Sequence, residues 1–385
     1  MGLLRIILAL AVVISHSGGF FGLKSIGGLR AVQIFFIISG FYMSMILDKK
    51  YTGKGSYLLF LSNRFLRIYP VYWFILFLTI FISIISAIFT DNWFFISPYI
   101  EYFEVISVDT LIFQIITNIA LFGQDISMFL GISTETGKMF FTHNYNLLEP
   151  RFNSFLLVPQ AWSLGVELMF YMIAPWIVRR SAFLIFSIII ISISLRFFTY
   201  NFIGYSFNPW TNRFFPFELS LFLFGTISYR LYCSRLITMN LGKIFQIFIV
   251  LAYFSIIIFH QKSLEFDRFP NLFNWLLYCY TCLVLPILFE FSKHSNIDYR
   301  IGELSYPIYI THILIIFLLS PPLKRMNFSN FNGEVIVIVT IILAFFIVKY
   351  ITNPIECIRQ KRVLCRDTRC KLSTSPTRHR DLCKY

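Results

Sequence analysis

Long apolar runs separated by short charged segments dominate this sequence. Eleven runs are candidate helices, near residues 3–21, 29–47, 71–90, 110–123, 161–178, 182–198, 214–231, 244–260, 274–291, 302–320 and 334–351. A run of about 20 apolar residues is long enough to cross the hydrocarbon core of a bilayer as a helix. The runs lack the alternation of barrel strands, and backbone polar groups cannot go unpaired in lipid. The pattern therefore predicts an all-α integral membrane protein.

The run 110–123 is the weakest span, because it is short and contains several amide and hydroxyl side chains. If it crossed the membrane, Arg179 and Arg180 would face the outside, against the rule that Lys and Arg collect in cytoplasmic segments. We therefore expect a bundle of about ten transmembrane helices with both termini in the cytoplasm. The acidic segment 91–160 then forms a large external loop.

Composition and charge support this assignment. Hydrophobic residues make up 57% of the chain and charged residues 14%, against about 25% charged residues in soluble domains. The net charge of +14 comes from basic residues at the ends of apolar runs, which favours membrane insertion and contact with anionic lipids over nucleic-acid binding. We predict one membrane domain, residues 1–356, and a basic cytoplasmic tail, residues 357–385.

The seven cysteines form no evident disulfide framework, so we expect free thiols in a reducing compartment. Four of them lie in the tail (Cys357, Cys365, Cys370 and Cys383), together with His379. Their spacing does not fit a compact zinc motif. We therefore predict no metal site.

Two ionisable residues lie in the first span, where each costs about 2.5–3.5 kcal/mol on insertion scales and so suggests a function. Arg5 and His16 are eleven residues apart, which places them within about 20° on one helix face and about 16 Å apart along the axis. Both can line one cavity. The alternative is an arginine that reaches the interface and a histidine satisfied by buried hydrogen bonds. The first span also resembles a signal peptide cleaved before Gly18, but an uncleaved anchor is the simpler interpretation.

Arg64 and Arg67 precede the third span, beside Tyr69. Arginines three residues apart share a helix face and can hold a phosphate by bidentate hydrogen bonds. The alternative interpretation is ordinary positive charge at a cytoplasmic boundary, followed by an aromatic belt.

Two further segments combine polar residues with apolar spans. WSLGVELMFY places Glu167 one turn after Ser163, near Trp162. A buried carboxylate requires a cationic or donor partner, or takes up a proton, and a structural Arg–Glu bridge between helices is the alternative. In GELSYPIYITH, Tyr309 and His312 share a helix face, and the alternative for His312 is a purely structural buried histidine.

Five segments together resemble the acyltransferase-3 family of bacterial membrane acyltransferases, which O-acetylate surface polysaccharides and lipopolysaccharide. They are the Arg5 and His16 pair, VQIFFIISGFYM (32–43), RFLRIYPVYW (64–73), WSLGVELMFY (162–171) and LSYPIYITH (304–312). They occur in the order typical of the family. Two positions depart from it, because Gln33 and Leu168 stand where family members often carry acidic residues.

The resemblance implies transfer of an acyl group, expected to be acetyl, from acetyl-CoA or another short acyl-CoA to a hydroxyl of a surface or lipid-linked glycan. The implied location is the bacterial inner membrane, with polysaccharide-synthesis machinery as a partner. The implied catalytic residues are His16 and Glu167, and Arg5, Arg64 and Arg67 would bind the CoA phosphates. Supporting residues would be Ser39, Tyr69, Trp162, Ser163, Tyr309 and His312.

Several alternatives stay open. His16 can act as a general base or accept the acyl group itself. Aromatic residues of the external loop are candidates for stacking on sugars, namely Trp93, Phe94, Tyr99, Tyr102 and Tyr145. Buried ionisable residues also suit a transporter or exporter of an anionic solute or glycan precursor, although we find no internal repeat. A third reading is an inactive partner in a polysaccharide-synthesis complex.

Overall fold

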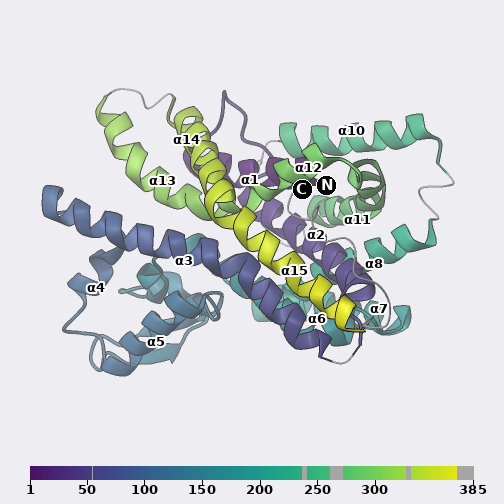
Figure 1. The fold of residues 1–385 in the computed structure, drawn as a ribbon. Coiled ribbons are helices and arrows are strands. Elements are labelled where there is room, and N and C mark those ends of the chain that lie inside the picture. The colour runs from purple at the N-terminus through teal and green to yellow at the C-terminus, as the bar shows by residue number, and fades with distance from the viewer. Residues whose placement is uncertain (54, 236–240, 261–271, 327–330, 371–385) are drawn as a thin grey trace.

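The computed structural model describes residues 1–385 except residues 54, 236–240, 261–271, 327–330 and 371–385. Helices make up nearly all of the described secondary structure (Figure 1), which confirms the predicted all-α class. The bundle contains α1 (Gly2–Ser17), α2 (Gly28–Lys49), α3 (Ser56–Thr90), α6 (Trp162–Ile177), α7 (Ala182–Phe198), α8 (Phe215–Ser234), α10 (Lys243–Phe259), α11 (Leu272–Ser292), α12 (Asn296–Glu303), α13 (Ser305–Arg325), α14 (Asn332–Ile347) and α15 (Asn353–Cys370).

In the described part of the chain, six helical segments are long and apolar enough to span a membrane, so the expected count of about ten is not confirmed. The six are Gly28–Lys49, Ser56–Thr90, Ala182–Ile203, Leu272–Ser292, Asn296–Arg325 and Asn332–Val363. The helices α1 and α10 are apolar but have only 16 and 17 residues. Length alone therefore keeps these two helices outside the six.

The segment 91–160 forms a compact unit at one end of the bundle. It contains α4 (Ser97–Glu101), α5 (Val108–Ala120) and an antiparallel pair of short strands, β1 (Leu130–Ile132) and β2 (Met139–Phe141). The helix α5 has 13 residues and is not among the six candidate spans, in agreement with its prediction as a non-spanning segment. Tyr99 and Tyr102 pack against the small core of this unit rather than forming an open sugar-stacking surface.

The third span begins earlier than the sequence suggested. We expected a helix over 71–90, but α3 has 35 residues and passes through Pro70, so Arg64 and Arg67 lie within the helix. Its aromatic side chains hold the loop unit in place. The hydroxyls of Tyr69 and Tyr72 and the indole N–H of Trp73 donate to the last carbonyls of α5, which lack partners within their own helix (Asn118, Ile119 and Ala120).

Two glycines bring α2 and α8 into backbone contact. A Cβ added to Gly40 would lie 1.8 Å from the Phe222 carbonyl oxygen, and one added to Gly225 would lie 1.9 Å from the Ile37 carbonyl oxygen. Small residues allow such close helix packing in membranes. The glycine of the SGF segment therefore positions the neighbouring Ser39.

Basic segments gather at the opposite end of the bundle, which we call the basic end. The Asp298 carboxylate accepts hydrogen bonds from the Met1 amino group (2.6 Å) and from the Leu3 amide (2.8 Å). Arg179 donates to the Tyr51 carbonyl (2.7 Å), and Arg362 donates to Ser62 (2.9 Å). The end that carries segment 91–160 is called the loop end.

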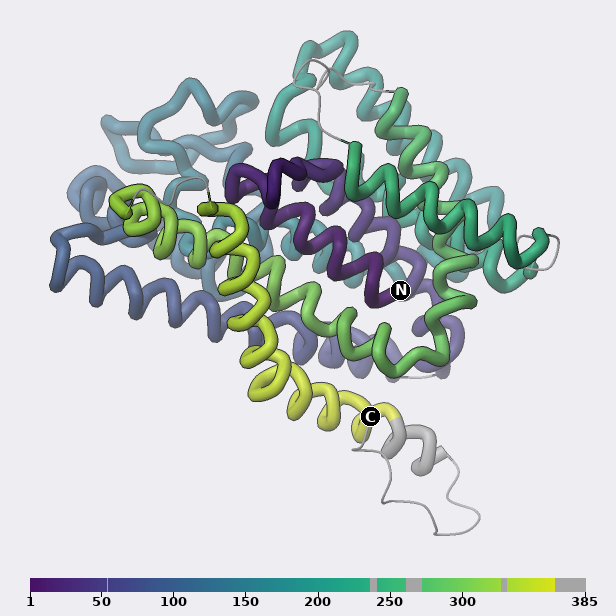
Figure 2. Tube along the Cα trace, turned by 90° about the horizontal axis from the view of Figure 1, so that it is seen from above, coloured from purple at the N-terminus to yellow at the C-terminus, as the bar shows by residue number. Residues whose placement is uncertain are grey.

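The last two helices, α14 and α15, form one long continuous helical segment. Figures 1 and 2 show α14 running on into α15, through a π-helical turn at 348–352. The predicted tail therefore begins as a helix that packs on α3, with no break at residue 357. His379 and Cys383, considered above as zinc ligands, lie outside the described residues.

Candidate active site

One cavity of about 320 Å³ extends between α1, α2, α3, α6, α12, α13 and α15. Toward the basic end its walls carry Arg5, Lys50, Arg64, Arg67, Glu303, Glu356 and Arg359, and toward the loop end they carry Ser39, Ser163, Glu167, Tyr171 and Tyr309. Five basic side chains face three acidic ones, so the lining has a positive excess when all are ionised. The cavity thus joins a cationic end to an end rich in hydroxyl groups.

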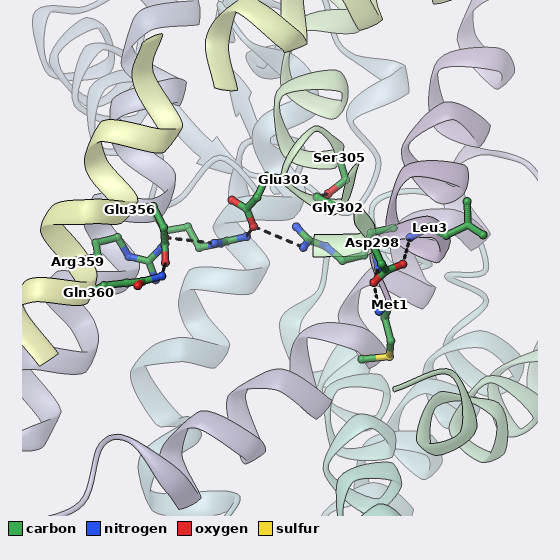
Figure 3. Close-up of polar contacts among 12 residues, drawn as sticks. Met1, Leu3, Asp298, Gly302, Glu303, Ser305, Glu356, Arg359 and Gln360 are labelled. Carbon is green, nitrogen blue, oxygen red and sulfur yellow. Dashed lines mark hydrogen bonds and ion pairs between the residues drawn. The ribbon is translucent and has the colours of Figure 1, made fainter. Parts of the chain in front are cut away.

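Arg67 is held by carboxylates. Its guanidinium nitrogens lie 3.1 Å from Glu303 and 3.8 Å from Glu356, and Arg5 lies 4.0 Å from the same Glu303 oxygen. Figure 3 shows Glu303 and Glu356 in this network, with Arg359 beside Glu356. Arg5 and Arg67 are therefore partly neutralised by protein groups.

Arg64 has a different environment. It is buried, and its guanidinium lies 5.9 Å from the Phe60 ring and 6.0 Å from the Tyr171 ring. Its Nε has no hydrogen-bond partner, and no carboxylate lies within 4.0 Å of it among the residues described. Of the three arginines predicted to bind a donor phosphate, Arg64 is the one whose charge is least neutralised by nearby carboxylates.

Glu167 is bound by hydroxyl groups. Ser39 donates to its Oε1 at 2.5 Å, and Tyr171 donates to the same oxygen from one turn along α6. In the described part of the chain no Lys or Arg lies within 4.0 Å of Glu167, so the Arg–Glu bridge considered above is not formed. The carboxylate faces the cavity with donor partners and without a counter-ion.

Ser163 and Tyr309 close the cavity toward the loop end. Their hydroxyl oxygens are 2.7 Å apart. The Tyr309 O–H also lies 2.7 Å from the Gln160 carbonyl and donates to it. Ser163 is then the donor to Tyr309. This pair joins α6 to α13.

His312 and His16 lie beyond this pair. His312 is fully buried, and its Nδ1 is 2.6 Å from the Tyr309 carbonyl. His16 is exposed, and its Nδ1 is 2.9 Å from the Val12 carbonyl. A carbonyl can only accept, so in each neutral ring Nδ1 carries the proton and Nε2 carries the lone pair. The His312 Nε2 has no partner among the described residues.

The cavity brings together seven of the predicted residues: Arg5, Ser39, Arg64, Arg67, Ser163, Glu167 and Tyr309. His16 is not part of its lining, so the expectation that Arg5 and His16 line one cavity is not met. His16 contacts His312 instead of Glu167. Tyr69 binds α5 outside the cavity, and Trp162 lies against Arg213.

Sequence reasoning missed several charged residues of the site. Glu303 is the second residue of the GELSYPIYITH segment, and an acidic residue at the start of a predicted span was the available signal. Glu356 and Arg359 were assigned to the boundary of the tail. Arg213 and Asp125 lie in polar connections where charge is ordinary, so no local pattern distinguished them.

Comparisons with known proteins identify the family to which this chain belongs. The family model described as an acyltransferase domain, Acyl_transf_3, matches residues 1–353. "Protein 2 in picA locus" of Rhizobium radiobacter is 39% identical over 70 residues, which cover 18% of this chain and 37% of that protein. No solved structure matches. Because the family match covers almost the whole chain, which also carries several helices able to span a membrane, the chain belongs to the acyltransferase-3 family of membrane acyltransferases.

Proposed function

We propose that the protein transfers an acyl group, expected to be acetyl, from acyl-CoA to a hydroxyl of a surface or lipid-linked glycan. One observation carries the proposal. A single cavity joins a cationic end to Glu167 and to the Ser163–Tyr309 pair, next to the His16 and His312 rings.

The cationic end suits the polyanionic CoA nucleotide. Among the residues that the structure describes, Arg64 has no carboxylate partner within 4.0 Å and the Nε of the buried Arg359 has no hydrogen-bond partner. The volume of about 320 Å³ is at the low end for small-molecule sites, about 300–1,000 Å³. It therefore suits the narrow acyl-pantetheine arm, while the nucleotide stays at the basic end.

The proposed reaction places the thioester near Tyr309 and the acceptor hydroxyl near the histidines. The lone pair of His16 Nε2 takes the hydroxyl proton as the oxygen attacks the thioester carbon. A C–O bond forms, the C–S bond breaks, and the sulfur leaves as CoA thiolate, to which the imidazolium can return the proton. In the alternative route, Nε2 first accepts the acyl group and then passes it to the hydroxyl. Glu167 belongs to the donor side, because its partners are Ser39 and Tyr171 and not an imidazole.

The orientation follows from charge. The basic end would face the cytoplasm and the loop end the outside, with both termini cytoplasmic and the protein in the plasma membrane. Acyl-CoA would then enter from the cytoplasm, and the glycan would approach under the 91–160 unit.

The test uses purified protein in liposomes, acetyl-CoA labelled in its acetyl group, and glycan from cells that lack the protein. We expect CoA release and labelled glycan, and loss of both in His16→Ala. His143→Ala, a loop histidine stacked on Tyr205, is the matched control. A transporter would move solute without releasing CoA, and an inactive assembly partner would leave glycan acetylation in cells unchanged by His16→Ala. Either result would overturn the proposal.

A further inference from the structure

Arg213 is a buried guanidinium with unused hydrogen-bonding capacity. It lies in the connection before α8, at the loop end, and is 8% exposed. Its Nε and Nη1 have no hydrogen-bond partner, and no carboxylate lies within 4.0 Å of it, among the described residues. Buried polar groups are normally hydrogen-bonded, and an unpaired buried charge is costly. The side chain is therefore arranged for a group that the chain itself does not supply.

The position of Arg213 links it to the candidate active site. Its guanidinium carbon is 4.4 Å from the centre of the Trp162 ring, and Trp162 directly precedes Ser163 of the Ser163–Tyr309 pair. Arg213 does not line the cavity of about 320 Å³, in which acyl-CoA is proposed to bind and which has the Ser163–Tyr309 pair toward the loop end. It lies on the loop side, where the proposed acceptor would approach.

Asp125 lies in the same region without neutralising Arg213. It is 3% exposed and packs on Gly165, where an added Cβ would be 2.9 Å from its Oδ1. It forms no ion pair with Arg213 within 4.0 Å. Burial lowers the pKa of Arg213 to about 10, with Tyr145, Tyr309 and Asp125 opposing the shift, so the guanidinium stays charged at neutral pH.

We propose that Arg213 binds an anionic oxygen group, a carboxylate or a phosphate, on the glycan acceptor and so selects acidic acceptors. This inference rests on the proposed function. A planar guanidinium matches two oxygens of a carboxylate or phosphate through parallel N–H donors. The Trp162 face holds the guanidinium in place, and Asp125 can accept a hydrogen bond from a neighbouring sugar hydroxyl.

The test measures binding to the purified full-length protein by ligand-observed NMR with three probes: methyl glucuronoside, glucose 1-phosphate and methyl glucoside. We expect at least one anionic probe to bind about tenfold or more tightly than the neutral glucoside, because hydrogen bonds between charged groups are stronger than those to a neutral group. Comparison of methyl glucuronoside with glucose 1-phosphate shows whether the site prefers a carboxylate or a phosphate.

Variants make the test specific. Arg213→Gln should remove the preference for the anion, Arg213→Lys should retain part of it, and Asp125→Asn should strengthen anion binding about two- to tenfold by removing a nearby negative charge. Arg151→Gln, an exposed arginine of the same loop unit, should change nothing. CoA binding, measured in the same samples, reports whether each variant is folded.

Equal binding of the neutral and anionic probes, or an unchanged preference in Arg213→Gln, would overturn the inference. If Arg213→Gln does not fold, the wild-type preference and the Asp125→Asn response decide the question. A protein that transfers acetyl groups but treats neutral and acidic acceptors alike would refute the inference and uphold the proposed function. Arg213-dependent anion binding without acyl transfer from acetyl-CoA would uphold the inference about Arg213 and refute the proposed function.

Discussion

The imidazole rings of His16 and His312 lie with their centroids 5.2 Å apart, although the two residues come from opposite ends of the sequence. The packing of α1 against α13 brings them together. In both rings Nδ1 faces a backbone carbonyl, which leaves Nε2 as the basic atom. The two rings thus lie beyond the Ser163–Tyr309 pair, each with its Nε2 available as the basic atom.

This arrangement predicts different consequences for the two histidines. His16→Ala should lower kcat by about 10²–10⁴-fold and leave the thermal midpoint nearly unchanged, because His16 is exposed. His312→Ala should also lower kcat but should destabilise the fold, because the ring is fully buried. Steady-state kinetics and thermal unfolding of both variants measure these effects. Full activity of His16→Ala would contradict the assignment.

Apolar runs between charges were enough to locate some helices. The run 182–198 coincides with α7, and 214–231 overlaps most of α8. The start of α3 was misplaced because the runs were delimited by charged residues, whereas this helix includes Arg64 and Arg67 and continues through Pro70. The count of about ten spans stays a prediction, because α1 and α10 are apolar but have only 16 and 17 residues.

The site, like the fold, could be predicted from the sequence only in part. The resemblance assigned Arg64 to the donor phosphates, Glu167 to catalysis and Tyr309 to a supporting role, and all three line one cavity. Pairings between distant segments, such as Arg67 with Glu303, were beyond sequence reasoning. They depend on helix packing, which no local spacing encodes.

Arg64 and Arg67 should respond differently to substitution. Arg64→Gln should raise the donor KM about tenfold or more through loss of a charge-assisted contact, with little change in stability, because Arg64 has no ion pair within 4.0 Å in the described structure. Arg67→Gln should destabilise the protein by about 1–3 kcal/mol, because the buried Glu303 loses its 3.1 Å partner and keeps only Arg5 at 4.0 Å.

The pair Arg67→Gln/Glu303→Gln provides the control. The double variant should recover much of the stability, because neither position then carries a charge that lacks its partner. Thermal midpoints and acetyl-CoA titrations of the three variants distinguish the roles. Equal loss of stability in Arg64→Gln and Arg67→Gln would show that the paired and unpaired arginines do not differ as the contacts indicate.

Glu167→Gln tests the role of a negative charge in the cavity. The amide oxygen of glutamine can still accept from Ser39 and Tyr171, so the thermal midpoint should change little. If the charge matters for catalysis, kcat should fall about 10- to 100-fold. Glu290→Gln, at a surface ion pair with Lys293, is the matched control. A wild-type kcat in Glu167→Gln would show that Glu167 acts only as a hydrogen-bond acceptor and that its charge has no catalytic role.

Asp125 should make stability depend on pH. Burial raises its pKa to about 6, and the Asp125 and Ile126 amides and Arg213 oppose the shift. A carboxyl with a raised folded-state pKa binds its proton more tightly in the folded state, so its contribution to stability is lost as pH rises from about 4 to about 6. The loss amounts to at most about 3 kcal/mol.

The matching measurement is the thermal midpoint of Asp125→Asn relative to wild type from pH 4 to pH 8. The variant should gain relative stability as pH rises through that window and then reach a plateau. Arg213 keeps its charge in this range, so it does not produce the trend. Glu135→Gln, an exposed acid of the same loop unit, should show no such gain, and a pH-independent difference for Asp125→Asn would refute the prediction.

Gln33, which departs from the acid common in the family, faces Glu218. Its amide nitrogen lies 3.3 and 3.4 Å from the two Glu218 oxygens, Tyr278 donates to its carbonyl, and Arg196 pairs with Glu218 at 2.6 Å, all in a buried setting. Gln33→Glu would replace a donor by a second carboxylate at hydrogen-bond distance. One carboxyl must then take up a proton, and the expected loss of stability is about 2–4 kcal/mol.

Exchanging the two residues separates this electrostatic explanation from a steric one. Gln33→Glu/Glu218→Gln restores one carboxylate and one amide in the same space, so its thermal midpoint should recover most of the loss if charge repulsion causes it. Activity should recover in parallel if the network needs one carboxylate from either helix, since Arg196 would still have an acidic partner nearby. If the exchanged variant were no more stable than Gln33→Glu, the position of the carboxylate on α8, and not its presence in the network, would be what the fold requires.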